Sequence, residues 1–307
     1  MRQFLSIDIG GTAIKYGLVT ETGEIRRRKK YDAFFDAYQT PLLTTLQRSV
    51  KDFYQELVAQ GEPIDGIALS VTGDVDSESN RLDDGCGSIP GWTGIALDEE
   101  IAHAIGRSYP TTALNDANAA ALAEMWSGNA QGYRHAIVYT IGTGIGGGII
   151  VDGKILNGAR GYGGNIGHMA ICSTPQNCHC GNNGCFEYVA STRALLRAAK
   201  KVGFEGDGEA LFAAAGTDVR LQGVLDEFFR YHGIAVASLL HIFNSEAILI
   251  GGGISNQGQW FLDRIREEAH KYCLPHFIRG VDFKIAKHTN DAGLLGAVKY
   301  FLDKRSV

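Results

Sequence analysis

The feature that most limits how this chain can fold is a strand–glycine–strand plan that occurs twice. In each copy an apolar strand enters a short glycine-rich turn and a second apolar strand leaves it. The copies consist of Phe4–Ile9, Gly10-Gly11-Thr12 and Ala13–Val19, and of Ala136–Ile141, Gly142-Thr143-Gly144 and Gly146–Val151. Such β-rich runs joined by glycine turns predict β-hairpins. We therefore expect an internally duplicated fold.

After each hairpin the pattern changes to alternating helices and strands. Further strands are expected from Ile25 and at Ile64–Val71, Thr111–Leu114, Lys154–Leu156, Ala247–Ile250 and Phe283–Ala286. Helices are expected at Ile95–Gly106, Ala117–Trp126, Ser191–Val202, Glu209–Ala215, Val219–Phe243, Trp260–Tyr272 and from Ala292. This order predicts an α/β fold with two mixed-sheet lobes. The first lobe is expected to comprise residues 1–114 and 292–307, and the second residues 115–291.

The composition is that of an ordinary soluble protein. The chain has 307 residues, 45% of them hydrophobic and 21% charged, which suits roughly two domains. Its net charge of −5 argues against a nucleic-acid partner, and no apolar run is long enough to span a membrane. The basic run from Arg26 to Lys30 is interpreted as a solvated strand edge. With six cysteines and no signal-peptide pattern, the expected compartment is the cytoplasm.

Three cysteines and one histidine form the pattern of a zinc site with four protein ligands. They are His168, Cys178, Cys180 and Cys185. Free thiols or a disulfide are the alternatives, and the sparse cysteine content disfavours a disulfide. Four protein ligands leave no position for water, so the zinc is expected to be structural and to hold Glu187 in place. His179, between two of the cysteines, is interpreted as a bystander.

Two glycine motifs resemble nucleotide-binding loops but lack the required context. The run Gly142-Thr143-Gly144-Ile145-Gly146-Gly147 satisfies G-x-G-x-x-G, yet β-branched residues follow where a dinucleotide site needs a helix. The run from Gly148 to Lys154 spells G-x-x-x-x-G-K, but Ile155 stands where a P-loop needs serine or threonine. A strand–glycine–strand turn can instead bind anions through exposed backbone amides. The paired turns are therefore expected to clamp phosphate.

These residues together resemble the ROK family of bacterial sugar kinases and sugar-responsive repressors. That family belongs to the actin-like and hexokinase-like ATPase superfamily, with a ribonuclease-H-like fold in two lobes. The matching segments are Asp8-Ile9-Gly10-Gly11-Thr12, Leu114-Asn115-Asp116-Ala117-Asn118, Ile141-Gly142-Thr143-Gly144, the zinc run and Gly251-Gly252-Gly253. The likeness covers nearly the whole chain.

The resemblance implies an ATP-dependent hexose kinase with magnesium and a structural zinc, acting on glucose or a close derivative. Homo-oligomers are also implied. ATP and magnesium are expected at Asp8, Gly10, Gly11, Thr12, Lys15, Gly142, Thr143, Gly144, Gly251 and Gly252. The sugar is expected at Asn115, Asp116, Asn165, His168 and Glu187, with Asp116 as the catalytic base for the primary hydroxyl. Spacing alone favours a different role for Asp116, as the N-cap of the following helix.

Two departures from the family pattern affect the substrate. Asn165 stands where the family usually has a glutamate that contacts sugar hydroxyls, so an N-acetylmannosamine or β-glucoside kinase is an alternative. Thr72-Gly73 replaces a usual Pro-Gly pair, which is expected to loosen that loop. A sugar-sensing transcription regulator is the alternative from another class. The first glycine motif begins at Asp8, which is expected to leave no room for the regulator's DNA-binding module.

Overall fold

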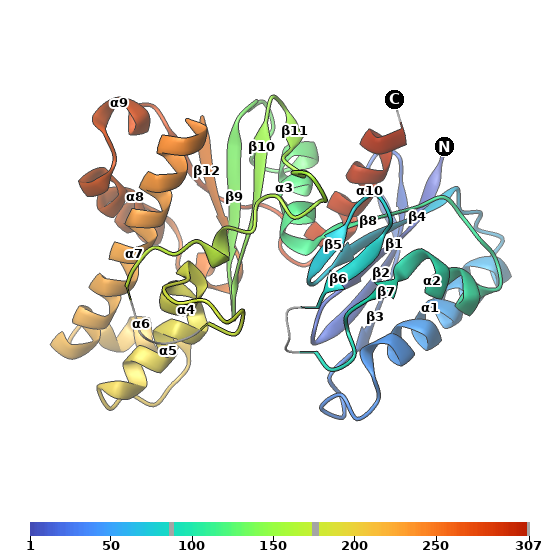
Figure 1. Ribbon diagram of the computed structural model, residues 1–307, viewed down its shortest axis with the longest axis horizontal. Helices are drawn as coiled ribbons and strands as arrows, with labels where there is room; N and C mark the ends of the chain where they lie inside the picture. The colour runs from blue at the N-terminus through green and yellow to red at the C-terminus, as the bar shows by residue number, and fades with distance from the viewer. Residues whose placement is uncertain (86–88, 174–177, 306–307) are drawn as a thin grey trace. The chain divides into compact units, whose positions relative to one another are not determined.

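Each strand–glycine–strand repeat forms the start of its own five-stranded mixed sheet. The computed structural model describes residues 1–85, 89–173 and 178–305. The first sheet has the order β3-β2-β1-β4-β8. Its strands are β1 (Gln3–Ile9), β2 (Ala13–Thr20), β3 (Ile25–Asp32), β4 (Gly66–Val71) and β8 (Thr111–Asn115) (Figure 1). The hairpin strands are antiparallel, and β1, β4 and β8 run parallel.

The second sheet repeats this arrangement, with the order β11-β10-β9-β12-β13. Its strands are β9 (Ala136–Ile141), β10 (Ile145–Val151), β11 (Lys154–Ile155), β12 (Ala247–Gly251) and β13 (Asp282–Ile285). In both sheets the first strand of the repeat lies in the centre, between its hairpin partner and a parallel strand. The expected duplication and the α/β class are confirmed. A β-strand follows Gly142–Gly144, as expected, at the place where a dinucleotide-binding motif requires a helix.

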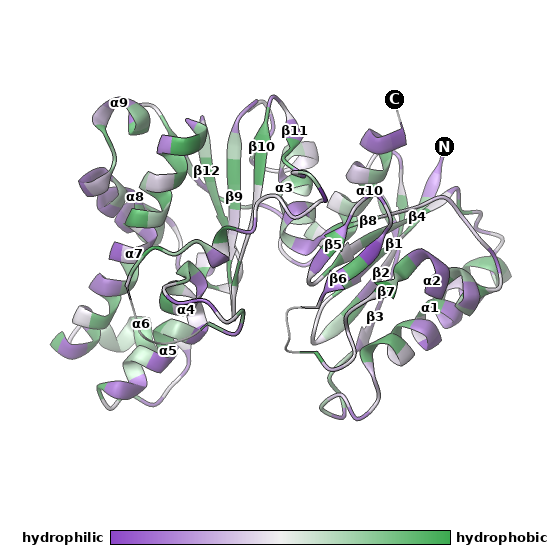
Figure 2. Ribbon diagram, in the orientation of Figure 1, coloured by the Kyte–Doolittle hydropathy of each residue, from purple (hydrophilic) through white to green (hydrophobic). Residues whose placement is uncertain are grey.

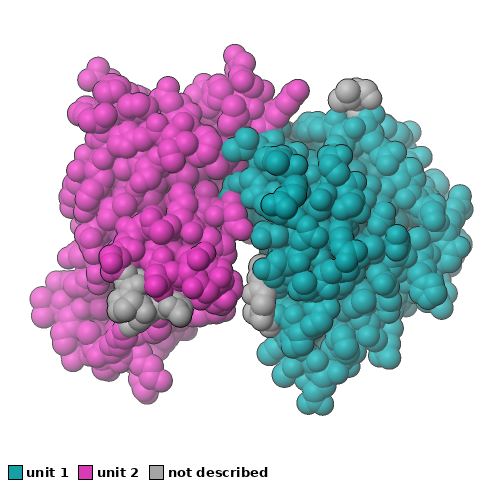
Figure 3. Space-filling model, in the orientation of Figure 1, with its two compact units in different colours: residues 1–131, 155–164, 290–307 teal, residues 132–154, 165–289 magenta. Residues whose placement is uncertain are grey.

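The chain divides into two compact units (Figure 3). Unit 1 comprises Met1–Gln131, Ile155–Gly164 and Asn290–Val307, and unit 2 comprises Gly132–Lys154 and Asn165–Thr289. Unit 1 is larger than the lobe expected from the sequence, because helix α3 (Asp116–Ser127) belongs to it. The reason is packing: Ala119 and Leu122 of α3 share a buried cluster with Leu294 and Phe301 of the C-terminal helix α10 (Ala292–Arg305).

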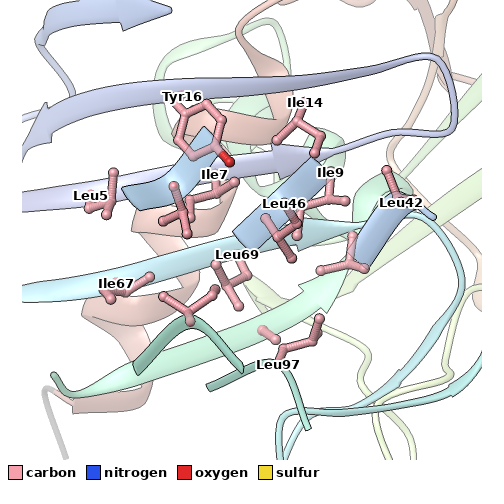
Figure 4. Packing of buried hydrophobic residues seen from close by; sticks show 14 of the residues in the cluster. Leu5, Ile7, Ile9, Ile14, Tyr16, Leu42, Leu46, Ile67, Leu69 and Leu97 are labelled. Atoms are coloured by element: carbon pink, nitrogen blue, oxygen red, sulfur yellow. The ribbon is translucent and has the colours of Figure 1, made fainter. Parts of the chain in front are cut away.

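The opposite face of the first sheet is covered by α1 (Leu42–Ala59) and α2 (Leu97–Ile105). Alternate residues of β1 point to this side, where Leu5, Ile7 and Ile9 pack with Leu46 of α1 (Figure 4). Helix α1 is amphipathic (Figure 2) and was not expected from the sequence, although apolar residues recur at helical spacing along it. A small sheet of order β5-β6-β7 completes unit 1, with strands Asp74–Asp76, Arg81–Asp84 and Ile95–Ala96.

Unit 2 holds the remaining helices. They are α4 (Phe186–Ala190), α5 (Thr192–Lys201), α6 (Gly208–Ala215), α7 (Val219–Phe243), α8 (Gln259–Tyr272) and α9 (Pro275–Ile278), with the short 3-10 helices η1 (Ile166–His168) and η2 (Gly253–Gln257). His232 of α7 is fully buried, and burial lowers the pKa of its imidazole to about 3. Its Nε2 is 3.1 Å from the Ala190 carbonyl, so this neutral ring donates a hydrogen bond to the end of α4.

The basic run occupies β3, which is an edge strand as expected. Its side chains pair with carboxylates of neighbouring segments: Arg28 lies 3.0 Å from Asp291, and Lys29 lies 2.7 Å from Asp52. Lysine and arginine at such an edge discourage pairing with a further strand. Among the helices of the described residues, none combines the length and the apolar character that crossing a bilayer requires.

Candidate functional site

Strand pairing in unit 1 collects polar residues at the carboxyl ends of the parallel strands β1 and β4 and at the start of the antiparallel strand β2. Asp8 of β1 is in register with Lys15 of β2 and with Ser70 of β4. Lys15 Nζ lies 3.1 Å from Asp8 Oδ2, and Ser70 Oγ donates to Asp8 Oδ1 at 2.8 Å. Lys15 also donates to the Asn290 carbonyl at 3.1 Å. Both oxygens of Asp8 are therefore held in a fixed orientation.

A glycine of α10 makes room for this carboxylate. The Asp8 side chain extends from the face of β1 that packs on α10, and a Cβ at Gly293 would overlap its oxygens. Any side chain at position 293 must therefore displace Asp8 or the helix. Ser70 was not among the residues expected from the sequence. Only the parallel register of β1 and β4, which no local pattern specifies, brings it to Asp8.

The strand-to-helix junction at Asn115 and Asp116 lies at the same edge of the first sheet. Asn115 is the N-cap of α3: its Oδ1 accepts from the amides of Ala117 at 2.9 Å and Asn118 at 3.4 Å. Its Nδ2 donates to the Gly73 carbonyl at 3.0 Å. Asp116 is the first residue of the helix, so the N-cap role that spacing favoured for it was wrong. The capping side chain belongs to its neighbour.

The Asp116 carboxyl lies in a setting suited to proton transfer. Burial raises the pKa of Asp116 to about 7, and the negative charge of Asp8 adds to the increase. The Ala117 amide and the Lys15 charge act in the opposite direction. A carboxyl with a pKa near neutrality can accept a proton from a substrate and release it again at physiological pH. Its side chain keeps partial exposure, so a ligand can reach it.

The first glycine turn presents backbone amides that its own hairpin does not use. Gly10 N donates to the Ala13 carbonyl at 3.0 Å, which closes the turn. The amides of Gly11 and Thr12 donate to no described residue. Their carbonyls are occupied, by the Tyr38 hydroxyl at Gly11 and by an amide at Thr12. The peptide units thus present N–H groups that no described residue accepts, as an anion site requires.

The second turn, in unit 2, has the same design. Gly142 N donates to the Gly144 carbonyl at 2.9 Å, while the amides of Thr143 and Gly144 donate to no residue in the described part of the chain. Glu187 of α4 supports this turn, because its Oε2 accepts from Ile145 N at 2.9 Å. A Cβ at Gly144 would overlap that carboxylate. Any side chain at position 144 would therefore have to displace the Glu187 carboxylate.

The Gly251-Gly252 segment lies beside the second turn. Gly251 ends β12 and is in register with Thr140 of β9, two residues before the turn begins. The Gly252 carbonyl accepts from the Ser255 hydroxyl at 2.7 Å, which shapes the bend into η2. The residues predicted to bind nucleotide in unit 2 are therefore adjacent in space.

The four predicted zinc ligands come together. The ligand atoms of His168, Cys178, Cys180 and Cys185 all lie within 4.8 Å of one another. Cys180 Sγ is 3.6 Å from Cys185 Sγ, and Cys178 Sγ is 3.9 Å from His168 Nδ1. Ligands at Zn–S and Zn–N distances of about 2.3 and 2.0 Å in a tetrahedron are separated by about 3.5 to 3.8 Å. The donor set and its spacing therefore fit zinc. Residues 174–177 of this loop lie outside the described residues.

The remaining predicted sugar residues belong to unit 2. Asn165 directly precedes η1, and its carbonyl accepts from His168 N at 3.3 Å. His168 ends η1 and is one of the four clustered ligands. Glu187 follows Cys185 by two residues and reaches the second glycine turn. Asn165 and Glu187 are therefore tied through short segments to the metal-ligand cluster.

The loop in which Thr72-Gly73 replaces Pro-Gly is tethered on both sides. The Thr72 carbonyl accepts from Trp92 Nε1 at 3.2 Å, and the Gly73 carbonyl accepts from Asn115 Nδ2. Trp92 is buried. The expected loosening of this loop is therefore offset by two side-chain hydrogen bonds from other parts of unit 1.

These features define the class of protein: the paired mixed sheets, each opening with a glycine hairpin, form an actin-like α/β fold. The chain belongs to the ROK family, whose family model matches residues 4–304. A glucokinase of Thermotoga maritima is 29% identical, with 98% of this chain and 98% of that protein covered.

Solved structures agree with this assignment. The ROK hexokinase from Thermus thermophilus is 28% identical with a TM-score of 0.83, and the match covers 99% of this chain and all of that one. A ROK family glucokinase from Streptomyces griseus, solved in complex with glucose and AMPPNP, is 28% identical with a TM-score of 0.77. That match covers 97% of this chain and 98% of the Streptomyces chain. The fold class expected from the sequence is confirmed.

Proposed function

We propose that this protein is an ATP-dependent sugar kinase that phosphorylates the primary hydroxyl of a hexose, glucose or a close derivative. The observation that carries the proposal is the Asp116 carboxyl beside Asp8, with its pKa raised to about 7 by burial and by that neighbour. Family members that are glucokinases support it, as does the Streptomyces griseus complex with glucose and AMPPNP. A base with a pKa near the working pH is suited to the proton transfer that such a reaction needs.

In the proposed reaction Asp116 accepts the proton of the sugar's primary hydroxyl. The hydroxyl oxygen forms a bond to the γ-phosphorus of ATP, and the bond from that phosphorus to the bridging oxygen breaks, which releases ADP. Most of the catalysis in phosphoryl transfer comes from positioning and from neutralisation of charge. Asn115 is proposed to help position the sugar. One hydrogen of its Nδ2 is donated to the Gly73 carbonyl, and this bond fixes the direction of the second hydrogen, which is proposed to bind the sugar.

In each unit, backbone amides are proposed to bind phosphate. In unit 1 these are the amides of Gly11 and Thr12, and in unit 2 those of Thr143 and Gly144. Asp8 is the proposed magnesium ligand, because magnesium prefers one or two carboxylates together with phosphate oxygens and water. Lys15 lies beside Asp8, and its positive charge is proposed to neutralise part of the negative charge of the phosphates. Gly251 and Gly252 are proposed to contact the adenosine.

We also propose that zinc is bound by His168, Cys178, Cys180 and Cys185 and that it is structural. The clustering of the four ligand atoms supports this, and a complete protein ligand set excludes a bound water as nucleophile. The metal would fix the loop that leads directly into α4 and Glu187. Its expected effect on the reaction is therefore indirect, through the shape of the sugar site.

The identity of the sugar is the finer part of the proposal. Asn165 can both donate and accept, whereas the carboxylate usual at this position only accepts. Relatives with other substrates exist: a β-glucoside kinase of Klebsiella pneumoniae is 31% identical, and a Listeria monocytogenes protein of the same fold is described as a putative N-acetylmannosamine kinase. We favour glucose or a close derivative, with these two sugar classes as alternatives.

The test is release of ADP from magnesium ATP across a sugar panel. The panel contains glucose, mannose, allose, fructose, N-acetylmannosamine, N-acetylglucosamine and cellobiose. We expect one hexose to be phosphorylated at its primary hydroxyl, which phosphorus NMR of the product verifies, and Asp116→Asn to abolish most of the signal. A chain that binds one of these sugars but releases no ADP with any of them is a sensor, and that outcome refutes the kinase proposal.

A further inference from the structure

His179, between two zinc ligands, contacts the carboxylate that supports the second glycine turn. Its Nδ1 lies 3.2 Å from Glu187 Oε1. The other oxygen of the same carboxylate, Oε2, accepts from Ile145 N at 2.9 Å. Glu187 is thus held at both oxygens, by the metal-binding loop on one side and by the glycine turn on the other.

The chemistry of the pair determines where the hydrogen lies. A carboxylate can only accept hydrogen bonds, so a hydrogen bond in this contact requires the hydrogen on His179 Nδ1. The same nitrogen is 3.7 Å from Cys178 Sγ, and the His179 ring packs edge-on against the His168 ring at 5.3 Å between centroids. His179 therefore contacts two of the four predicted ligands as well as Glu187. His179 was interpreted as a bystander to the metal, and its contact with Glu187 is an additional feature that the sequence pattern did not indicate.

His179 could alternatively be a metal ligand, because Cys178, His179 and Glu187 also form a cluster of possible donors. The cluster of His168 with the three cysteines makes a further ligand unnecessary. Three sulfurs and the His168 nitrogen already supply the four ligands that a tetrahedral zinc site needs, and Cys178 belongs to both groups. A nitrogen that donates to a carboxylate through its hydrogen has no lone pair to offer to a metal.

We propose that His179 is a positioning residue that orients Glu187 and thereby sets the affinity for the sugar. The proposal rests on the proposed kinase function for its effect on substrate, but the contact between His179 and Glu187 does not. Without His179, Oε1 loses its fixed donor while Oε2 keeps Ile145. The carboxylate can then rotate about the remaining bond. Sugar hydroxyls bound by Glu187 lose their preorganised partner.

The experiment is a double-mutant cycle with His179→Ala and Glu187→Gln. In His179→Ala we expect bound zinc to remain near one ion per chain. The KM for the sugar should rise roughly tenfold, which corresponds to a charge-assisted hydrogen bond of about 1.4 kcal/mol. The KM for ATP should change by less than about twofold, because the contact with Ile145 remains. His179→Asn, which can place an amide hydrogen near the Nδ1 position, should restore most of the sugar affinity.

The cycle separates an effect through Glu187 from a general one. If His179 acts through Glu187, His179→Ala should have almost no further effect on the sugar KM in the Glu187→Gln background. Equal effects in both backgrounds, or loss of zinc in His179→Ala, overturn the proposal. The matched control is His135→Ala, which removes another histidine–carboxylate contact of unit 2, 3.6 Å from Asp152. It should leave the sugar KM unchanged.

The unfolding midpoints of the same variants give a readout that needs no substrate. His179→Ala and Glu187→Gln should have non-additive effects on the unfolding midpoint. The effects of His135→Ala and Glu187→Gln on the midpoint should be additive. A chain that phosphorylates no sugar but shows this coupling refutes the kinase function and supports the His179–Glu187 contact. Additive midpoints refute the contact, whatever the activity.

Discussion

Replacing Asp116 by asparagine tests the proposed base and leaves the rest of the junction intact. Asn115 caps α3, so the substitution does not remove the cap. Asparagine has nearly the same shape as aspartate but cannot accept the hydroxyl proton. We expect turnover to fall by roughly 10²- to 10⁴-fold, the range for loss of a general base, with little change in the affinity for ATP.

The pKa of Asp116 also predicts the effect on stability and its sign. The folded value of about 7 lies well above the ordinary value of 3.8, so the folded protein holds this proton more tightly than the unfolded chain does. The ionised carboxylate therefore destabilises the fold, and this penalty appears as pH rises from about 4 to about 7. Three pH units correspond to about 4 kcal/mol at most. Partial exposure of the side chain reduces the expectation to about 1–3 kcal/mol.

Asp116→Asn removes this penalty, so the variant should gain stability relative to the natural protein at pH 8 and much less at pH 5. Thermal unfolding at both pH values measures the difference, which should amount to several degrees at pH 8. The matched control is Asp98→Asn, in the first turn of α2. Asp98 occupies a similar position near a helix start, and its substitution should give no pH-dependent gain.

The activity of the natural protein supplies a second check. If Asp116 must be ionised to act, kcat/KM should fall roughly tenfold for each pH unit below about 7 and level off above it. The reasoning is refuted if Asp116→Asn keeps near-normal turnover in a folded protein. It is equally refuted if the stability difference between the variant and the natural protein is the same at pH 5 and pH 8.

Three further predictions concern the metal loop, the sugar and the second turn. Cys180→Ser should lower the amount of bound zinc, measured by elemental analysis, and should weaken sugar affinity because Glu187 is displaced. Full activity in metal-free protein contradicts a structural metal. Asn165→Glu should raise the affinity for glucose relative to N-acetylmannosamine and cellobiose, because a carboxylate accepts stronger hydrogen bonds from hydroxyls. If the ranking of the sugars is unchanged, residue 165 does not determine which sugar is bound. Gly144→Ala should raise the KM for sugar and ATP at least tenfold, since its Cβ would displace Glu187. Gly142→Ala should have a clearly smaller effect, because among the described residues its Cβ would meet only the Gly144 carbonyl, at 4.0 Å; equal effects contradict the steric argument.

Local patterns were sufficient for most of the elements. The limits of α7 were predicted without error, and those of β9 as well, because long periodic runs and strands bounded by turns carry their information within a short window. Helix α1 was missed although its buried residues have helical spacing. Its exposed face is rich in polar residues, and it follows Pro41 without a side-chain cap. The usual signal for the start of a helix is therefore absent at this element.

The residues of the candidate site could also be proposed from the sequence, since they lie in short-range motifs. The two glycine turns and the four clustered ligand atoms are each contained in one short segment. The spacing of the residues predicted Asp116 as the N-cap of α3, whereas the N-cap is Asn115. Two neighbouring polar residues at a strand end are equivalent by pattern, and only the backbone geometry of the junction distinguishes Asn115 from Asp116.

The sequence by itself thus predicted the duplicated hairpins, which the structure confirms, and a zinc-ligand set and a catalytic base, which stay predictions. Tertiary structure alone decided what surrounds them. Ser70 reaches Asp8 through the parallel register of β1 and β4, and Gly293 makes room for that carboxylate from the other end of the chain. His179 reaches Glu187 through the fold of the loop that carries the clustered cysteines. The physical reason is range: turns and ligand motifs depend on neighbours along the chain, whereas burial, charge proximity and pKa depend on segments that only folding brings together.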